Sequence, residues 1–133
     1  MAVWHHRRMS TIASRTEFTV TEKRSRFVAL AAPASTLSDA EAVVAERRKH
    51  HRKARHHSWA CRLRDETGRV VEQARDDGEV GRPGMKLLEL LRGAELEGVI
   101  VVSRFFGGVK LGPAGVGRAC RDAGAGALAA LAP

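Results

Sequence analysis

The chain of 133 residues contains no tyrosine and only two cysteines, and both scarcities limit what it can do. Cys61 and Cys120 do not have the spacing of a metal site, so we expect buried, reduced thiols and assign no metal. A disulfide between them is also compatible with the sequence. No apolar run approaches the roughly 20 residues that a membrane-spanning helix needs. We therefore expect a cytoplasmic protein without a membrane partner.

The glycine fingerprints of nucleotide sites are missing as well. No glycine is followed at P-loop spacing by Gly-Lys-Ser or Gly-Lys-Thr, and Cys120 stands where a dinucleotide loop beginning at Gly115 needs its third glycine. We therefore assign no cofactor. The chain has four phenylalanines and two tryptophans, and its basic run is poorly interleaved with them. Base stacking in the manner of single-strand binders is not expected.

Positive charge is abundant, because 23 lysines and arginines face 15 acidic residues, giving a formal net charge of +8. Such an excess favours partners that carry negative charge, such as RNA, the ribosome or an acidic protein surface. A basic, well-solvated surface without a dedicated partner is the alternative.

The pattern along the chain predicts a flexible arm over residues 1–14 and a single domain over residues 15–133. Apolar alternation and turn residues predict strands at 16–20, 24–31, 58–64, 69–75 and 99–106. Helices are expected from Ser38 to about Lys53, where Ser38 and Glu41 have capping-box spacing, over 85–92, and after Pro113. This order predicts an α+β fold: a two-layer sandwich in which helices cover one face of a mixed sheet of four to five strands.

The segment 103–117, with the sequence SRFFGGVKLGPAGVG, is the most informative part of the chain. It predicts a strand, a tight glycine loop and a helix N-terminus, an arrangement that suits an anion. Glycines let the backbone approach an oxyanion and cations supply charge, so the predicted phosphate or RNA contacts are Arg104, Gly107, Gly108, Lys110, Gly112 and Arg118. The alternative is a structural turn with solvated charges.

A second candidate surface is the basic run 47–55, RRKHHRKAR. It could lie along an RNA backbone without reading the base sequence, and its predicted contacts are Arg47, Arg48, Arg52 and Lys53. A solvated helix end is the alternative, because cations also suit a helix C-terminus.

His56 and the acidic loop 76–79 are the only candidates for catalysis, with His56 or Asp77 as a base. The loop carboxylates could hold Mg²⁺, or they could cap the following helix or pair with Arg75 and Arg82. We favour a hydrogen-bonded structural role for His56 and expect a non-enzymatic chain.

Four ordered segments resemble the IMPACT/YigZ family: 23–29 (KRSRFVA), 54–60 (ARHHSWA), 76–83 (DDGEVGRP) and 104–119, which begins RFFGGVKLG. The resemblance implies the fold of the superfamily that includes a small-subunit ribosomal protein domain and domain IV of elongation factor G. It also implies a role in translational control through protein partners. Many bacterial members carry a second, ferredoxin-like domain, and we expect this chain to correspond to the N-terminal IMPACT domain alone.

The chain departs from the family pattern in two places. About four residues of the acidic loop are missing, with their hydroxyls, and Phe105 and Cys120 replace frequent tyrosines. These losses count against an enzyme that binds a phosphorylated small molecule.

The expected function is therefore a translation-associated binding module that contacts RNA or ribosomal phosphates through its basic surface and glycine loop. A protein-interaction regulator without nucleic-acid binding is the main alternative, and a small-molecule substrate is not expected.

Overall fold

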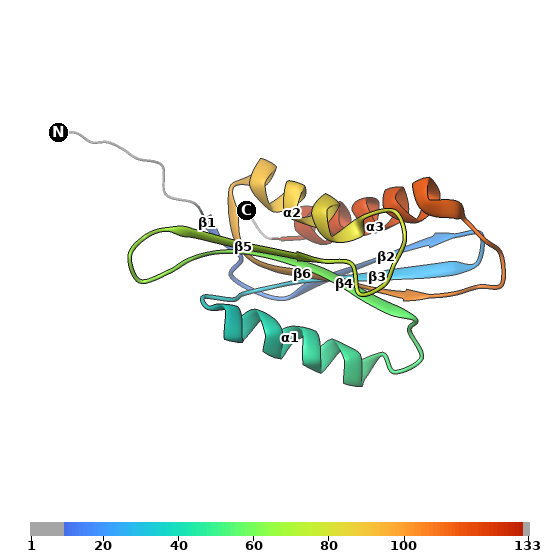
Figure 1. Cartoon of the computed structure of the whole chain (residues 1–133), viewed down its shortest axis with the longest axis horizontal. Coiled ribbons are helices and arrows are strands. Elements are labelled where there is room, and N and C mark those ends of the chain that lie inside the picture. The colour runs from blue at the N-terminus through green and yellow to red at the C-terminus, as the bar shows by residue number, and fades with distance from the viewer. Residues whose placement is uncertain (1–9, 132–133) are drawn as a thin grey trace.

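A six-stranded sheet with helices on both faces forms the framework of the domain (Figure 1), and its strands are antiparallel apart from the short β1. The structure is a computed structural model, and it describes residues 10–131. The strands run in the order β2-β3-β6-β4-β5, with the short β1 beside β6. The elements are β1 (Ser10–Thr11), β2 (Thr16–Glu22), β3 (Ser25–Ala32), α1 (Leu37–His50), β4 (His56–Arg64), β5 (Val70–Arg75), α2 (Pro83–Ala94), β6 (Leu96–Phe105) and α3 (Gly112–Ala129).

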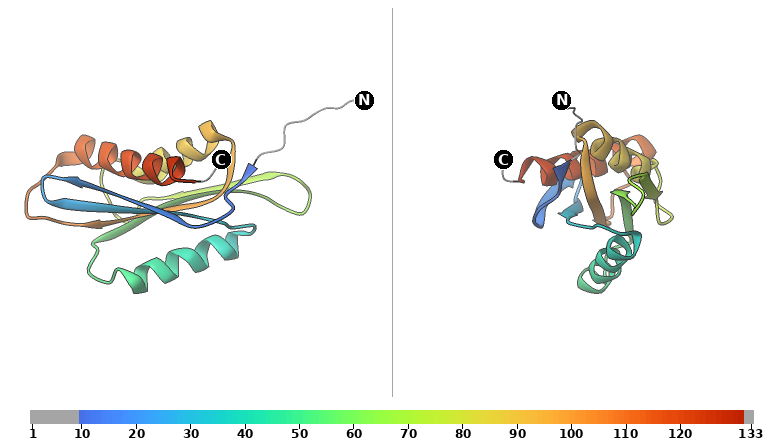
Figure 2. Two further views of the ribbon diagram at one scale, coloured as in Figure 1. Left: turned by 180° about the vertical axis from the view of Figure 1, so that it is seen from behind. Right: turned by 90° about the vertical axis from the view of Figure 1, so that its left-hand side faces the viewer.

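The α+β class is confirmed, but the expectation that all helices lie on one face is wrong. Helix α1 covers one face of the sheet, and α2 and α3 cover the other (Figures 1 and 2). The reason lies in β3 and β6, whose residues are apolar at successive positions, so both faces of the central strands need cover. Ile100 and Val102 pack with α2 and α3, whereas Val99 and Val101 pack with α1.

The expectation of a flexible arm is wrong for residues 10–12, which are held by the sheet and the core. Ser10 and Thr11 pair in parallel with Leu96 and Glu97 of β6, which makes the sheet mixed. The next residue, Ile12, is only 2% exposed and belongs to the core under α2 and α3. An apolar side chain so deeply buried anchors the backbone on both sides of it. Residues 1–9 of the predicted arm lie outside the described residues.

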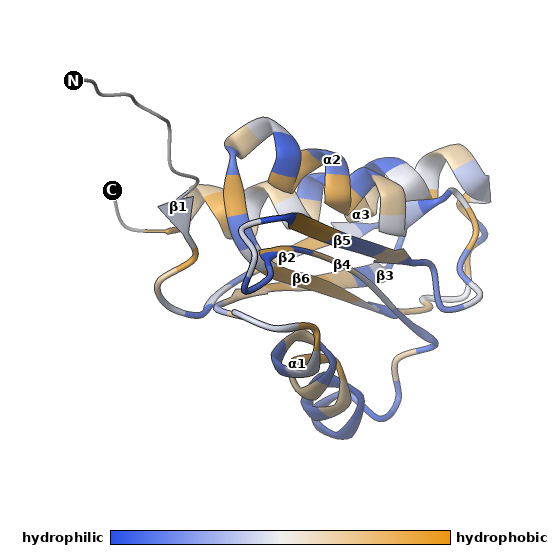
Figure 3. Ribbon diagram, turned by 60° about the vertical axis from the view of Figure 1, so that its left-hand side comes forward, coloured by the Kyte–Doolittle hydropathy of each residue, from blue (hydrophilic) through white to orange (hydrophobic). Residues whose placement is uncertain are grey.

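Helix α1 is largely hydrophilic (Figure 3) and holds to the sheet by a narrow apolar stripe. The stripe consists of Ala40, Val43, Val44 and Arg47, all of which are buried. The predicted start at Ser38 is wrong. The capping box is formed by Thr36, whose hydroxyl accepts the amide of Asp39 at 3.0 Å while the Asp39 carboxylate accepts the amide of Thr36 at 3.2 Å.

The two cysteines are free and buried on opposite sides of the sheet, Cys61 under α1 and Cys120 on α3. Burial raises the pKa of the Cys61 thiol to about 11 and that of Cys120 to about 12. Because the thiolate is the reactive form, we expect neither thiol to react with iodoacetamide at pH 8 in the native chain, whereas both react in denaturant. Mass spectrometry of the alkylated chain checks this, and rapid native labelling of either thiol would contradict it.

Candidate anion-binding site

Strand register assembles the candidate site at one end of the sheet. His56, the first residue of β4, lies opposite Arg104 near the end of β6. The loop from β6 to α3 begins there, and Figure 1 shows it at the end of the sheet opposite the β4–β5 hairpin. Two of the predicted motifs, 54–60 and the glycine loop, are therefore neighbours in space.

Each glycine of that loop has a structural reason to be glycine. A side chain on Gly107 would collide with the backbone of Arg24 in the β2–β3 turn, and the Gly107 amide donates to the Ser25 hydroxyl at 3.2 Å. Gly108 and Gly112 have φ angles of +89° and +76°, which L-residues rarely adopt. After this turn α3 begins without a side-chain cap, and Pro113 lacks an N–H. The turn explains the glycines, and the uncapped helix start leaves room for an anion.

Arg104 is not the accessible phosphate ligand that the sequence suggested, because it is buried and paired. Its side chain is 10% exposed, and its Nη1 lies 3.1 Å from Oε1 of Glu79, whose side chain is 2% exposed. A buried arginine needs such a partner. Arg104 Nε and Glu79 Oε2 are both buried without a hydrogen-bond partner among the described residues. The pair is therefore incompletely satisfied.

The other carboxylates of the acidic loop hold the backbone in place. Asp76 Oδ1 accepts the amide of Gly84 at 2.9 Å and thereby caps α2 from outside the helix. Asp77 Oδ2 accepts the amide of His57 at 2.9 Å and a guanidinium N–H of Arg48 at 3.1 Å. Capping was one of the alternatives that the sequence left open, and these contacts occupy Asp77 as a structural acceptor.

His56 lies beside the acidic loop. Its Nδ1 is 2.8 Å from the carbonyl oxygen of Asp77. Because a carbonyl only accepts, Nδ1 carries the proton, and Nε2 is left 3.9 Å from Oε1 of Glu79. The neighbouring His57 is buried and bonded to the Ser103 hydroxyl at 2.8 Å. Desolvation, and then the charge of Arg48, lowers the pKa of His57, which favours its neutral form.

The structure divides the basic run into buried and exposed members. Arg47 has a 5% exposed side chain and pairs with Glu17 at 3.0 Å, so its assignment as an RNA contact is corrected. Arg48 is half-exposed but bound to Asp77. Arg52 and Lys53 are exposed, and neither side chain has a carboxylate of residues 10–131 within 4.0 Å, the limit for an ion pair. Of the four predicted contacts in this run, these two are the ones that are free to meet a phosphate.

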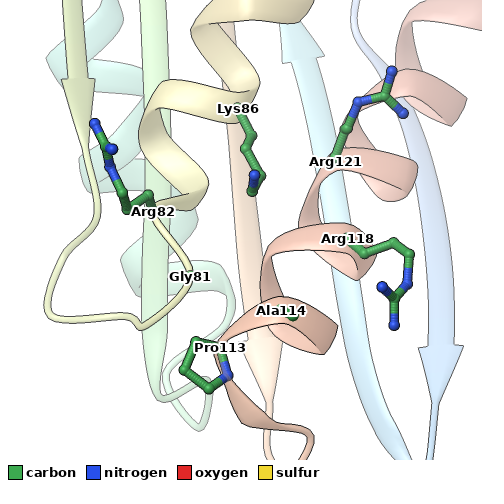
Figure 4. A pocket seen from close by; sticks show the side chains of 7 residues that line it. All are labelled: Gly81, Arg82, Lys86, Pro113, Ala114, Arg118 and Arg121. Carbon is green, nitrogen blue, oxygen red and sulfur yellow. The ribbon is translucent and has the colours of Figure 1, made fainter.

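A cavity of about 560 Å³ lies between the first turns of α2 and α3 (Figure 4). It is lined by Gly81, Arg82, Lys86, Pro113, Ala114, Arg118 and Arg121. Arg121 lies 3.8 Å from Asp122, and both are exposed. Arg82, Lys86 and Arg118 have no carboxylate within 4.0 Å in the described chain. Sequence reasoning assigned only Arg118 to an anion site, because Arg82 was considered there as a partner of the acidic loop and no motif marks Lys86 or Arg121.

Two glycines hold this cavity in shape. A side chain on Gly81, whose φ is +86°, would lie 2.8 Å from the amide nitrogen of Gly117 in α3. A side chain on Gly117 would in turn lie 2.7 Å from the carbonyl oxygen of Gly81 and 2.7 Å from Cε of Lys86. The loop before α2 therefore packs directly on the α3 backbone, and the lysine stem crosses Gly117.

Lys110 belongs to a second, smaller cavity of about 300 Å³ with Arg55, His56, Arg104 and Phe106. Pro113 lines both cavities. The sequence suggested that Arg118 reaches the same anion as Arg104 and Lys110. The structure instead places Arg118 in the cavity between α2 and α3 and Lys110 in the smaller one.

Residues 10–131 contain no group of three or more histidine, cysteine, aspartate or glutamate side chains placed to hold a metal ion. Among the same residues, no helix has the length and apolar character to cross a membrane.

Fold and site together define a small α+β domain with two basic cavities at the start of α3. The chain belongs to the Impact N-terminal domain family, whose model matches residues 23–128. It is 40% identical over 107 residues to an IMPACT family member of Thermus thermophilus, covering 80% of this chain and 56% of that protein. Over 101 residues it is 36% identical to the IMPACT family member YigZ of Escherichia coli, covering 73% of this chain and 48% of that one. The chain thus spans about half the length of these relatives.

Two solved structures share the fold. One, described as a hypothetical protein, has a TM-score of 0.81 and 31% identity, covering 92% of this chain and 60% of its own. The other, the two-domain translational regulator Yih1, has a TM-score of 0.57 and 25% identity, covering 96% of this chain and 54% of its own. These similarities confirm the resemblance read from the four motifs.

Proposed function

We propose that this chain is a non-enzymatic, translation-associated binding module that contacts phosphates of RNA, free or in the ribosome. The observation that carries the proposal is the cavity between α2 and α3, where Arg82, Lys86 and Arg118 have no carboxylate partner in the described chain. The likeness to a structure described as a translational regulator supports the process. The protein would act in the cytoplasm.

Phosphate fits this cavity for electrostatic reasons. Two helices begin at its edge. The start of α2 is capped by Asp76, whereas α3 begins without a side-chain cap and presents unpaired amides and the positive end of its dipole. Lysine and arginine add charge-assisted hydrogen bonds to phosphate oxygens. Arg52 and Lys53 beyond α1, and Lys110 at the α3 start, extend the positive surface. Such contacts read the backbone and not the base sequence, so affinity should fall steeply with salt.

The hydrogen bonds already made by the two candidate bases favour binding over catalysis. Asp77 already accepts two hydrogen bonds within the domain, and the Nδ1 proton of His56 is held by a backbone carbonyl. A translational regulator that meets only proteins remains the competing hypothesis, and the experiment below separates the two.

Reversing two charges in the cavity should weaken RNA binding about a hundredfold or more. Hydrogen bonds to charged groups contribute about 1.5–3 kcal/mol each, and Lys86→Glu with Arg118→Glu removes two such donors. The control is Lys49→Glu with Arg69→Glu, the same change of charge at two exposed cations on α1 and on the β4–β5 hairpin, neither of which has a carboxylate within 4.0 Å in the described chain. Filter binding of RNA at several salt concentrations measures both affinity and salt slope.

If the two double variants lose RNA affinity equally, the loss comes from net charge alone, and the cavity is refuted as the contact site. Partners retained in a nuclease-treated pull-down by an RNA-inactive chain would instead establish the protein-interaction hypothesis.

A further inference from the structure

The smaller cavity is lined by an exposed aromatic ring, that of Phe106, and binding of phosphate alone gives no reason for this ring. Phe106 is 39% exposed although it follows a largely buried strand. The guanidinium carbon of Arg55 lies 4.9 Å from the centre of the Phe106 ring, and that of Arg104 lies 5.6 Å from it. All three residues line the same cavity of about 300 Å³. Two guanidinium groups and one phenyl ring therefore lie together in the lining of one cavity.

The cavity also carries charge that the protein leaves unsatisfied. Arg104 is nine-tenths buried at its lining, and its Nε has no acceptor among residues 10–131. Lys110 has no carboxylate within ion-pair distance in the described chain. The uncapped start of α3 at Gly112 and Pro113 completes the same wall. Lys110 and the uncapped start of α3 therefore supply donors at the cavity lining, and these donors suit an anionic group.

The remaining lining is apolar, and this distinguishes the ligand from a bare phosphate. Val80, Leu111, Pro113 and Val116 contribute to the walls. A bare phosphate gains nothing from such walls, whereas a planar ring gains by burying its faces on them. A volume of about 300 Å³ is at the lower end of the roughly 300–1,000 Å³ range of ligand cavities, which suits one small ring system with its phosphate.

We propose that this cavity receives one unpaired nucleotide of an RNA strand. Its base stacks on Phe106 or on the Arg55 guanidinium, and its phosphate meets Lys110 and the first turn of α3. Aromatic rings and guanidinium planes are the usual supports for splayed-out RNA bases. The inference rests on the proposed function, because the neighbouring cavity between α2 and α3, which shares Pro113, would hold an adjacent part of the same backbone. It adds a preference for single strands.

The test compares a short single-stranded RNA, carrying a fluorescent adenine analogue, with an RNA duplex of equal length. Phe106→Ala should lower the affinity for the single strand between about fivefold and a hundredfold, because stacking contributes about 1–3 kcal/mol per base. Affinity for the duplex should stay unchanged, since paired bases do not reach the ring. Phe106→Trp should retain single-strand binding and quench the analogue. Phe18→Ala, a second exposed phenylalanine that packs beside Gly126 of α3, is the control.

The outcomes separate this inference from the function on which it rests. Unchanged single-strand affinity in Phe106→Ala, with normal wild-type RNA binding, refutes the nucleotide cavity and leaves the phosphate contacts standing. Equal losses for single strand and duplex also refute it, because they show a general defect. Failure of the wild-type chain to bind either RNA overturns the proposed function and the inference together.

Discussion

Replacing Glu79 by alanine is expected to destabilise the domain by about 3–5 kcal/mol, because it leaves the charge of Arg104 buried without a partner. The two side chains are 2% and 10% exposed and are joined at 3.1 Å. Water cannot easily reach the orphaned guanidinium, so its desolvation is uncompensated. Urea unfolding followed by circular dichroism measures the loss.

The control for Glu79 is an ion pair of similar length at the surface. Glu46 pairs with Arg15 at 3.0 Å, and both side chains are about half exposed. Glu46→Ala should cost at most about 1 kcal/mol, as exposed pairs do. If Glu79→Ala costs no more than Glu46→Ala, the buried pair contributes nothing that a surface pair does not.

A double-mutant cycle then isolates the pair itself. In Glu79→Leu with Arg104→Met both charges are gone, so no buried charge is left alone, and the double variant should be more stable than the sum of the two single losses predicts. Additive losses would mean that the side chains act independently. The cycle also shows whether the pair is kept for stability or for the cavity that Arg104 lines.

Much of the fold could be predicted because local rules and tertiary packing agree along most of the chain. The strands around 58–64 and 99–106 follow from periodicity alone. The placement of α1 was missed, because a sequence of strands and helices does not say which face a helix covers. Only the apolar residues at successive positions of β3 and β6 carry that information.

The candidate site was predictable as a region but not as a set of contacts. The glycine loop and the end of the basic run both lie at the end of the sheet opposite the β4–β5 hairpin. Burial of Arg47 and Arg104 depends on Glu17 and Glu79, which are 30 and 25 residues away in sequence, and no spacing rule links them. The same holds for Arg55 and Phe106. A poor interleaving of aromatic and basic residues in sequence therefore did not exclude their stacking in space.

Gly81→Ala tests whether the close approach of the two helix starts creates the cavity between α2 and α3. We expect a loss of about 2–5 kcal/mol, of which roughly 1–2 kcal/mol comes from the positive φ angle and roughly 1–3 kcal/mol from pushing the loop off α3. The matched control is Gly68→Ala, because Gly68 has a φ of +85° against +86° for Gly81 but would meet nothing within 4 Å. Thermal unfolding of both variants separates the backbone cost from the packing cost.

Binding gives the second readout of the same pair of variants. Because the Gly81 contact sets the distance between Arg82 on one side and Arg118 on the other, Gly81→Ala should also weaken RNA binding at temperatures where the chain remains folded. Gly68→Ala lies on the distant hairpin and should bind RNA like the wild type. Equal destabilisation by the two substitutions would mean that α2 and α3 tolerate separation, and the cavity would then owe its shape to its side chains alone.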